Sequence, residues 1–174
     1  MAHYSIKLSR FSYLFLADTR SSIFWLLVRV YVGYEWFMAG FDKAQNSSWV
    51  GLSAGSPIIG FVNGALQKTA GAHPDVQMWY ATFLQNFVLT HPTFWTNAVA
   101  YGEVLVGLGL IVGCVVGVAA FFGVLMNVNY LLAGTVSVNP TLLILGIFLI
   151  LGRRVAGHLG LDYYVRPWLH KSST

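Results

Sequence analysis

The chain carries charged side chains inside stretches that are otherwise apolar. Arg29 and Glu35 lie within the apolar run 23–41, and Glu103 lies within a second apolar stretch, 96–134. A charge at the centre of a membrane-spanning helix costs roughly 2.5–3.5 kcal/mol on insertion scales, so such groups should face protein, water or each other. Two carboxylates that share one guanidinium leave one carboxyl group ready to take up a proton, which suits proton handling beside a redox ligand.

The spacing of these charges limits how they can pair. Six positions separate Arg29 from Glu35, which places the two side chains about 120° apart around a helix, so they are not a pair within one turn. Arg29 lies about 9 Å in from one end of the run by helical rise, and both glutamates lie near mid-depth. We therefore expect its long side chain to reach Glu35 or Glu103 in the folded bundle. A buried Arg–Glu pair that only fixes helix register is the structural alternative.

Other polar and aromatic residues of the same stretches are expected to complete a pocket between the helices. The predicted catalytic groups are Arg29, Glu35 and Glu103. The predicted cofactor-binding set contains these three and adds aromatic and polar neighbours, namely Tyr34, Trp36, Lys43, Tyr101 and Asn127. Ordinary packing is the alternative role for each of the aromatics. No nucleophile-and-base pair, phosphate loop or nucleotide fingerprint is visible in the sequence.

The composition indicates the solvent in which these elements fold. Of the 174 residues 56% are hydrophobic and only 9% are charged, far from ordinary globular usage, so we expect the lipid bilayer to surround the protein. The net charge of +4 comes mainly from the two chain ends, and no basic cluster alternates with base-stacking aromatics. A nucleic-acid partner is therefore not expected.

The apolar runs predict four membrane spans. The first is 23–41, about the 20 residues that cross the hydrocarbon core. The stretch 96–134 is twice that length and must fold back, with the turn expected near the glycines of 113–117. The fourth span runs from about 138 to 151, with Asn139-Pro140 suiting a helix start. The predicted fold is thus an all-α integral membrane four-helix bundle that forms a single domain over 1–174.

The remaining segments are expected outside the hydrocarbon. Residues 1–21 are interpreted as an interfacial N-terminus, 44–93 as an outward-facing helical insertion and 152–174 as a cytoplasmic C-terminal segment. Within the insertion, 75–90 has the period of a short amphipathic helix lying over the bundle. Seven Lys and Arg residues lie on the side of the termini and two, Lys43 and Lys68, on the side of the insertion. The positive-inside rule then predicts a multi-pass plasma membrane protein with both termini cytoplasmic.

Cysteine and histidine usage argues against several cofactors. Cys114 is the single cysteine, which excludes disulfides, thiolate metal sites and dithiol exchange within the chain. The five histidines lie in the tails, in the insertion or after the fourth span, and none is placed for axial ligation of a haem within the bundle. Neither haem nor a metal is expected.

Several motifs together resemble the DoxX/DoxD family of small four-helix membrane proteins. They are "RVYVGYEWFMAGFDK" in the first span, Gly102-Glu103 with "VGLGLIVG", "FFGVLMNVNYLLAGT" followed by Asn139-Pro140, and "GLDYY". The chain is most similar to the DoxD type, the small membrane subunit of thiosulfate:quinone oxidoreductase. That resemblance implies quinone as cofactor, a sulfur substrate and a second oxidoreductase subunit as partner, with Arg29, Glu35, Trp36, Lys43 and Glu103 among the characteristic positions.

The leading hypothesis is therefore a quinone-associated membrane subunit of a sulfur-compound:quinone oxidoreductase, with quinone bound between helices. Whether the chain alone is an enzyme stays open. The alternative is a non-enzymatic four-span scaffold or assembly protein that holds a partner through its outer insertion. A small transporter is disfavoured because no inverted repeat or paired broken helix is visible. A homo-oligomer formed through the face of Gly109, Gly113 and Gly117 is a further option.

Overall fold

The computed structural model describes residue 13 and residues 15–164, and this part of the chain is helical without any strand. The predicted all-helical class is confirmed. A short 3-10 helix η1 (Thr19–Ser21) leads into eight further helical elements. They are α2 (Ser22–Ala44), α3 (Ser56–Gln67), α4 (Met78–Phe83), the π-helix η2 (Leu84–Val88), α5 (Pro92–Val112), α6 (Val116–Leu132), α7 (Asn139–Leu151) and α8 (Arg153–Ala156).

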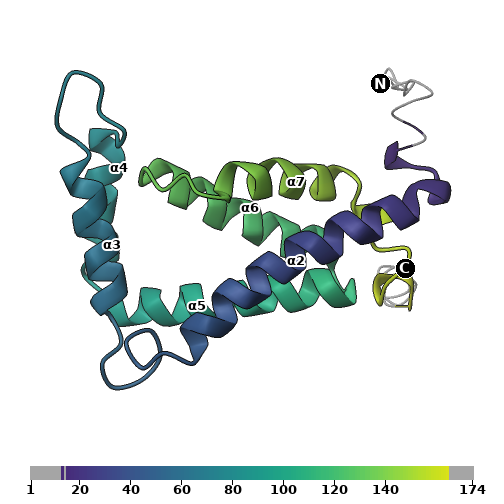
Figure 1. Cartoon of the computed structure of the whole chain (residues 1–174), viewed down its shortest axis with the longest axis horizontal. Coiled ribbons are helices and arrows are strands. Elements are labelled where there is room, and N and C mark those ends of the chain that lie inside the picture. The colour runs from purple at the N-terminus through teal and green to yellow at the C-terminus, as the bar shows by residue number, and fades with distance from the viewer. Residues whose placement is uncertain (1–12, 14, 165–174) are drawn as a thin grey trace, which may run out of the picture.

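Four long helices run side by side along the length of the molecule, and two elements cross one end of them (Figure 1). α2, α5, α6 and α7 form the bundle, and their bounds agree with the four predicted apolar runs. α3 and α4 lie across the end at which α2 finishes and α5 begins, which we call the insertion end. The opposite end holds the α5–α6 turn and α8, and we call it the turn end.

The helices differ in how well each would suit a bilayer. Among the described helices, α5 alone is both long and apolar enough to cross a membrane, while α6 and α7 are apolar but have only 17 and 13 residues. α2 is long, with 23 residues, but it carries four charged side chains: Arg29, Glu35, Asp42 and Lys43. Exposed aliphatic and aromatic side chains cover the outer faces of all four helices.

Glycines allow α2 and α5 to touch through their backbones. A Cβ atom at Gly40 would lie 2.5 Å from the Val104 nitrogen, and one at Gly33 would lie 2.9 Å from the Ile111 nitrogen. From the other side, a Cβ at Gly107 would collide with the backbone of Phe37. Small residues spaced along one face permit this close antiparallel approach. The contact fixes which turn of α2 lies beside which turn of α5.

The chain reverses between α5 and α6 where the sequence predicts it. Gly113 has a φ of 73° and Val115 a φ of 46°, both in the left-handed region. Asp162 closes the turn by accepting hydrogen bonds from the backbone nitrogens of Val115 at 2.5 Å and Val116 at 3.1 Å. Its carboxylate thereby caps the otherwise uncapped N-terminus of α6.

The predicted oligomerisation face is used inside the chain. Cβ atoms at Gly109, Gly113 and Gly117 would meet Ala119, the Arg29 guanidinium and the Arg153 side chain respectively. These glycines therefore provide room for intramolecular neighbours.

The insertion is fastened to α6 and the residues that follow it by an apolar cluster and by side-chain hydrogen bonds of Lys68 and Tyr80. The cluster contains the buried residues of α3, α4 and η2, namely Ile58, Val62, Ala65, Tyr80, Ala81, Leu84 and Val88, together with Val76 and Ala133. Lys68 Nζ donates to the Gly134 carbonyl at 2.7 Å, which places a cation at the C-terminal end of α6. The Tyr80 hydroxyl donates to the Asn129 carbonyl at 3.0 Å, and burial raises the pKa of this hydroxyl to about 12.

The short helix predicted within 75–90 is present, but it packs with a different face. Helical spacing within 75–90 places six residues near one side, which predicts that this side packs on the bundle. All six are exposed: Met78, Trp79, Thr82, Phe83, Asn86 and Phe87. The face formed by Tyr80, Ala81, Leu84 and Val88 packs against α3 and α6 instead, because the tyrosine hydroxyl finds its acceptor on α6. The helix α3 was not predicted.

The glycine contact between α2 and α5 can be tested by adding one methyl group. Gly107→Ala should lower stability by about 1–3 kcal/mol, because the new Cβ must displace the backbone of α2. Gly60→Ala is the matched control, since a Cβ there meets nothing within 4 Å and removing a helical glycine should stabilise α3 by about 0.5–1 kcal/mol. Thermal unfolding in detergent measures both variants. An equal change in unfolding temperature for the two variants would contradict the close backbone contact of α2 and α5.

Candidate functional site

The carboxylate of Glu103 joins three helices of the bundle. Glu103 lies on α5 and is 1% exposed. Its Oε2 accepts a hydrogen bond from Lys43 Nζ of α2 at 2.6 Å, and its Oε1 accepts one from the Tyr130 hydroxyl of α6 at 2.7 Å. A buried carboxylate is tolerated only when a countercharge and hydrogen-bond donors compensate for lost hydration. Lys43 and Tyr130 supply both.

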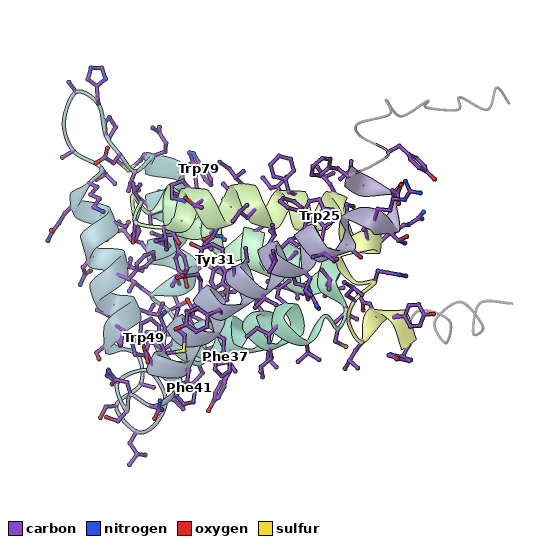
Figure 2. All side chains as sticks on the ribbon, turned by 45° about the vertical axis from the view of Figure 1, so that its right-hand side comes forward. Trp25, Tyr31, Phe37, Phe41, Trp49 and Trp79 are labelled. Atoms are coloured by element: carbon purple, nitrogen blue, oxygen red, sulfur yellow. The ribbon has the colours of Figure 1, made fainter. Side chains whose placement is uncertain are left out.

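Lys43 lies at the rim of this network, closer to solvent than its partner. Its side chain is 23% exposed, whereas that of Glu103 is 2% exposed. Besides the carboxylate, Nζ contacts the Ala39 carbonyl at 3.3 Å and lies 5.2 Å from the centroid of the Trp49 ring. Figure 2 shows Trp49 near Phe41 at the insertion end, far from Trp25. The ammonium group thus has a buried acid on one side and an aromatic ring on the other.

A cavity of about 370 Å³ opens over this network, and we call it the polar cavity. Helices α2, α3, α5, α6 and α7 and the segment 135–138 all contribute to its walls. The charged lining residues are Glu35, Lys43 and Glu103, and the aromatic ones are Trp36, Trp49, Phe61 and Tyr130. Its size falls in the range of about 300–1,000 Å³ that is usual for small-molecule sites, and a few polar groups among aromatic walls are typical of them.

Glu35 is the carboxyl group of the polar cavity that has no partner. It is half-buried and lines the cavity beside Trp36 and Ala39. Within the described part of the chain its side chain forms neither an ion pair nor a hydrogen bond. Glu35 therefore keeps its acceptor capacity for a ligand or a proton, while the carboxylate of Glu103 is occupied.

The expected pairing of Arg29 with the glutamates is wrong. Arg29 is buried at the turn end, where Nη2 donates to the Leu159 carbonyl at 2.9 Å and the charge of Asp162 lies nearby. The reason is the antiparallel register of α2 and α5, which sets Arg29 beside Gly113 and leaves Glu103 ten residues, or about 15 Å, further along α5. Lys43 takes the position beside Glu103 that Arg29 was expected to fill.

The other predicted site residues divide between the cavity and elsewhere. Trp36 is buried and lines the polar cavity. Tyr34 and Tyr101 are 55% and 50% exposed and do not line it, because their positions on α2 and α5 turn them outward. Asn127 is fully buried on α6, and neither atom of its amide has a hydrogen-bond partner among the described residues. The structure therefore brings together Glu35, Trp36, Lys43 and Glu103.

Three aromatic lining residues of the polar cavity are absent from the predicted site. Tyr130 could have been found, because it follows Gly123 and Asn127 at helical spacing on the buried face of α6. Trp49 and Phe61 come from the insertion. Helical periodicity within the bundle carries no information on how that segment folds back over it.

The chain is therefore a small helical protein with a ligand-sized polar cavity at one end of its bundle. A model of the DoxX family matches residues 24–136, well over half of the chain. The protein belongs to the DoxX family. Proteins of this family are usually membrane-associated, and α5 provides a candidate span. No curated protein and no solved structure shows significant similarity to the chain.

The Lys43–Glu103 pair predicts a specific pattern in a double-mutant cycle. Lys43→Met should destabilise the protein by about 3–5 kcal/mol, because it leaves a buried carboxylate without its countercharge. Glu103→Gln should cost less, since the partly exposed ammonium can turn to solvent. The double variant should recover part of the loss, with a coupling of about 0.5–3 kcal/mol.

The matched control for this cycle is Glu35→Gln, which changes the unpaired glutamate of the same cavity. It should shift stability by no more than about 0.5 kcal/mol and should not couple to Lys43→Met. Unfolding by heat or denaturant in one detergent measures all variants. A coupling for Glu35 as large as that for Glu103 would show that the pairing is wrong.

Proposed function

We propose that the protein is a four-span membrane subunit that binds a quinone headgroup in the polar cavity and serves a sulfur-compound:quinone oxidoreductase. The observation that carries this proposal is the polar cavity itself. It combines a lysine whose ammonium group is held by a buried acid, an unpaired glutamate and several aromatic walls. The sulfur substrate and the second oxidoreductase subunit come from the resemblance to DoxD-type proteins.

The four long helices support a membrane arrangement. By helical rise α2 and α5 are about 35 and 32 Å long, enough for the hydrocarbon core, while α6 and α7 reach about 26 and 20 Å. Local thinning of the bilayer accommodates short helices of this kind. Arg20, Arg153 and Arg154 lie at the turn end. In the plasma membrane that end would face the cytoplasm, and α3 and α4 would lie on the outer side of the membrane.

The residues of the polar cavity suit a flat ring that carries carbonyl oxygens. Trp49 and Phe61 offer apolar faces for the ring, and Lys43 can donate to an oxygen from the third hydrogen, which neither Glu103 nor the Ala39 carbonyl accepts. Glu35 can hold or release a proton at the same ring. Arg29 takes no part, because it lies at the turn end.

A bound quinone supplies two-electron, two-proton redox chemistry. The chain contributes binding, orientation and proton handling. Its single cysteine cannot form a dithiol pair, so electrons from a thiosulfate-type sulfur compound would come through the partner subunit. On this proposal the enzyme is the complex of this chain with its partner subunit.

Quinone binding is measured by quenching of tryptophan fluorescence in purified protein. Because Trp36 and Trp49 line the polar cavity, a chain-free benzoquinone should quench wild-type emission in a saturable way. Lys43→Gln should weaken binding about tenfold, as expected for loss of one charge-assisted hydrogen bond. Arg29→Gln is the control and should leave the Kd of the folded protein within about twofold. Absence of saturable quenching, or equal losses in both variants, would overturn the proposal.

A second candidate function is favoured by the exposed face of the insertion. Met78, Trp79, Phe87 and Phe94 are 67%, 64%, 54% and 62% exposed. In this region Phe83 stacks on Phe87, and Phe94 meets Trp95 edge to face. Such a face suits the contact surface of a scaffold or assembly protein. It equally suits the aromatic belt at a membrane interface.

Co-purification from the native membrane separates the two functions. A stoichiometric partner with its own redox centre supports the oxidoreductase subunit, and a client without one supports the scaffold. Phe87→Ser together with Trp79→Ser should release a client held by the exposed face while leaving quinone binding unchanged. Leu105→Ser on the outer face of α5 is the matched control. A client retained by the double variant would exclude this face as the contact.

A further inference from the structure

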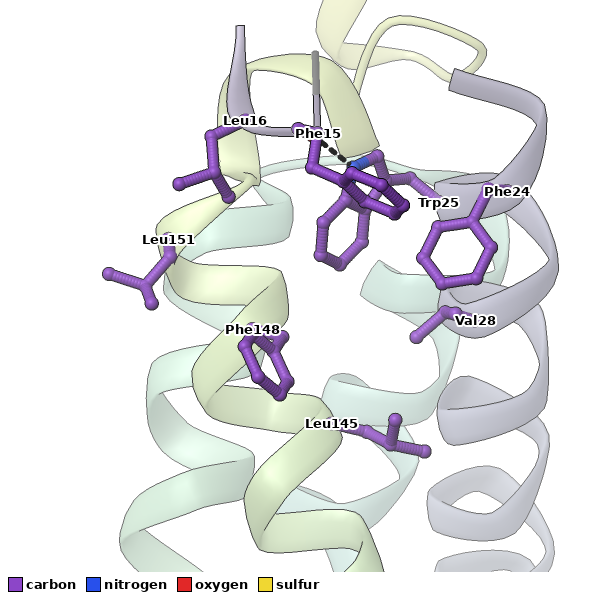
Figure 3. Close-up of a pocket in the computed structure, with 8 residues that line it drawn as sticks. All are labelled: Phe15, Leu16, Phe24, Trp25, Val28, Leu145, Phe148 and Leu151. Atoms are coloured by element: carbon purple, nitrogen blue, oxygen red, sulfur yellow. Dashed lines mark hydrogen bonds between the residues drawn. The ribbon is translucent and has the colours of Figure 1, made fainter. Parts of the chain in front are cut away.

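A second cavity lies between α2 and α7 toward the turn end, and we call it the apolar groove (Figure 3). Its volume is about 350 Å³. The lining residues are all apolar and come from α2, α7 and the segment before η1: Phe15, Leu16, Phe24, Trp25, Val28, Leu145, Phe148 and Leu151. A cavity with walls of this kind selects hydrocarbon.

The one polar side-chain atom in the walls is already bonded. Trp25 Nε1 donates to the Phe15 carbonyl at 2.6 Å, as the dashed line in Figure 3 shows. Ser21 Oγ lies 3.2 Å from the same carbonyl and donates its one hydrogen between this carbonyl and that of Asp18, which is closer at 2.8 Å. These bonds hold residues 15 and 16 across the groove as a fixed wall. They also leave no side-chain donor free to bind a headgroup there.

The apolar groove and the polar cavity are both lined by residues of α2 and α7, and we call the boundary between these two helices the seam. On α2 the residues Val28, Tyr31 and Glu35 follow each other at spacings of three and four, so they lie on one side of the helix. Val28 lines the groove and Glu35 lines the cavity, about 10 Å apart by helical rise. On α7, Leu142 lines the cavity and Leu145, one turn later, lines the groove.

We propose that the apolar groove binds the hydrocarbon chain of the same molecule whose ring lies in the polar cavity. This inference rests on the proposed function and makes the ligand an amphiphile with a compact polar head and an alkyl or isoprenoid chain. The chain leaves the ring at Glu35, passes the half-exposed Tyr31 and enters the groove beside Val28. The seam thus selects its ligand by head and chain together.

Two probes with one ring test the chain subsite. One is 2,3-dimethoxy-5-methylbenzoquinone without a chain, and the other carries a decyl chain on the same ring. Calorimetric titration of the protein in nanodiscs gives the advantage of the decyl probe as a ratio of Kd values. Val28→Trp and, independently, Leu145→Trp should lower this ratio at least fivefold while leaving the chain-free probe unchanged. Leu105→Trp, on the exposed outer face of α5, should leave the ratio unchanged.

The outcomes separate the two proposals. If the chain-free probe binds wild type and the groove variants behave like Leu105→Trp, the chain subsite is wrong and the quinone site stands. If the chain-free probe fails to bind wild type, the proposed function fails and the chain subsite with it. If a decyl amphiphile without the ring binds the groove as tightly as the decyl quinone, the groove holds a free membrane chain and the linkage is wrong.

Photolabelling gives a second measurement that does not depend on folded variants. A decyl quinone with a diazirine at the chain end should label segments 15–28 and 145–151 of the wild-type protein. An excess of the unlabelled decyl probe should prevent this labelling. Labels spread over the outer faces of α5 and α6 would overturn the proposal.

Discussion

A buried carboxylate on α5 is the constraint on which the arrangement of the bundle depends. Glu103 is nearly inaccessible and needs two donors, and these come from α2 and α6. The ammonium of Lys43 can reach it only because Gly40 lets α2 approach the backbone of α5 at that turn. The glycine contact and the ion pair therefore support each other. Loss of either partner would leave an uncompensated charge in a medium that cannot solvate it.

The two ends of the bundle handle their charges in different ways. At the turn end, Arg29 is enclosed by Gly113 and Gly160 and donates to a backbone carbonyl, with Asp162 as the countercharge nearby. Arg29 lines neither the polar cavity nor the apolar groove. At the insertion end, the Lys43–Glu103 pair forms the floor of the polar cavity. Arg29 thus lies apart from the polar cavity, which is at the end covered by α3.

The sequence predicted the helices far better than their partners. Apolar runs predicted α2, α5, α6 and α7 to within about four residues at each end, because length and hydropathy are local properties. The buried stripe with Gly33, Trp36 and Gly40 was also predictable from helical period. Which side chains pair between helices was not predictable, because the antiparallel register of two helices depends on which glycines interlock. Arg29 and Lys43 lie about four helical turns apart on α2, and a register error of that size exchanges one for the other. The positions of Trp49 and Phe61 in the polar cavity depend on how the insertion folds, and the helical periodicity of the bundle does not predict that.

The position of Glu35 explains how one seam could recognise both parts of an amphiphile. It lies where the polar lining of the cavity ends, and the next positions of the same stripe toward the turn end are Tyr31 and Val28. On the turn-end side of Glu35, a ligand charged along its length would meet only apolar walls. On the insertion-end side, an unsubstituted alkane would gain nothing from Lys43. The change of lining along α2 therefore sets the order of head and chain. On the proposed quinone function, this order would orient the ring toward the insertion end, the end at which the polar cavity lies.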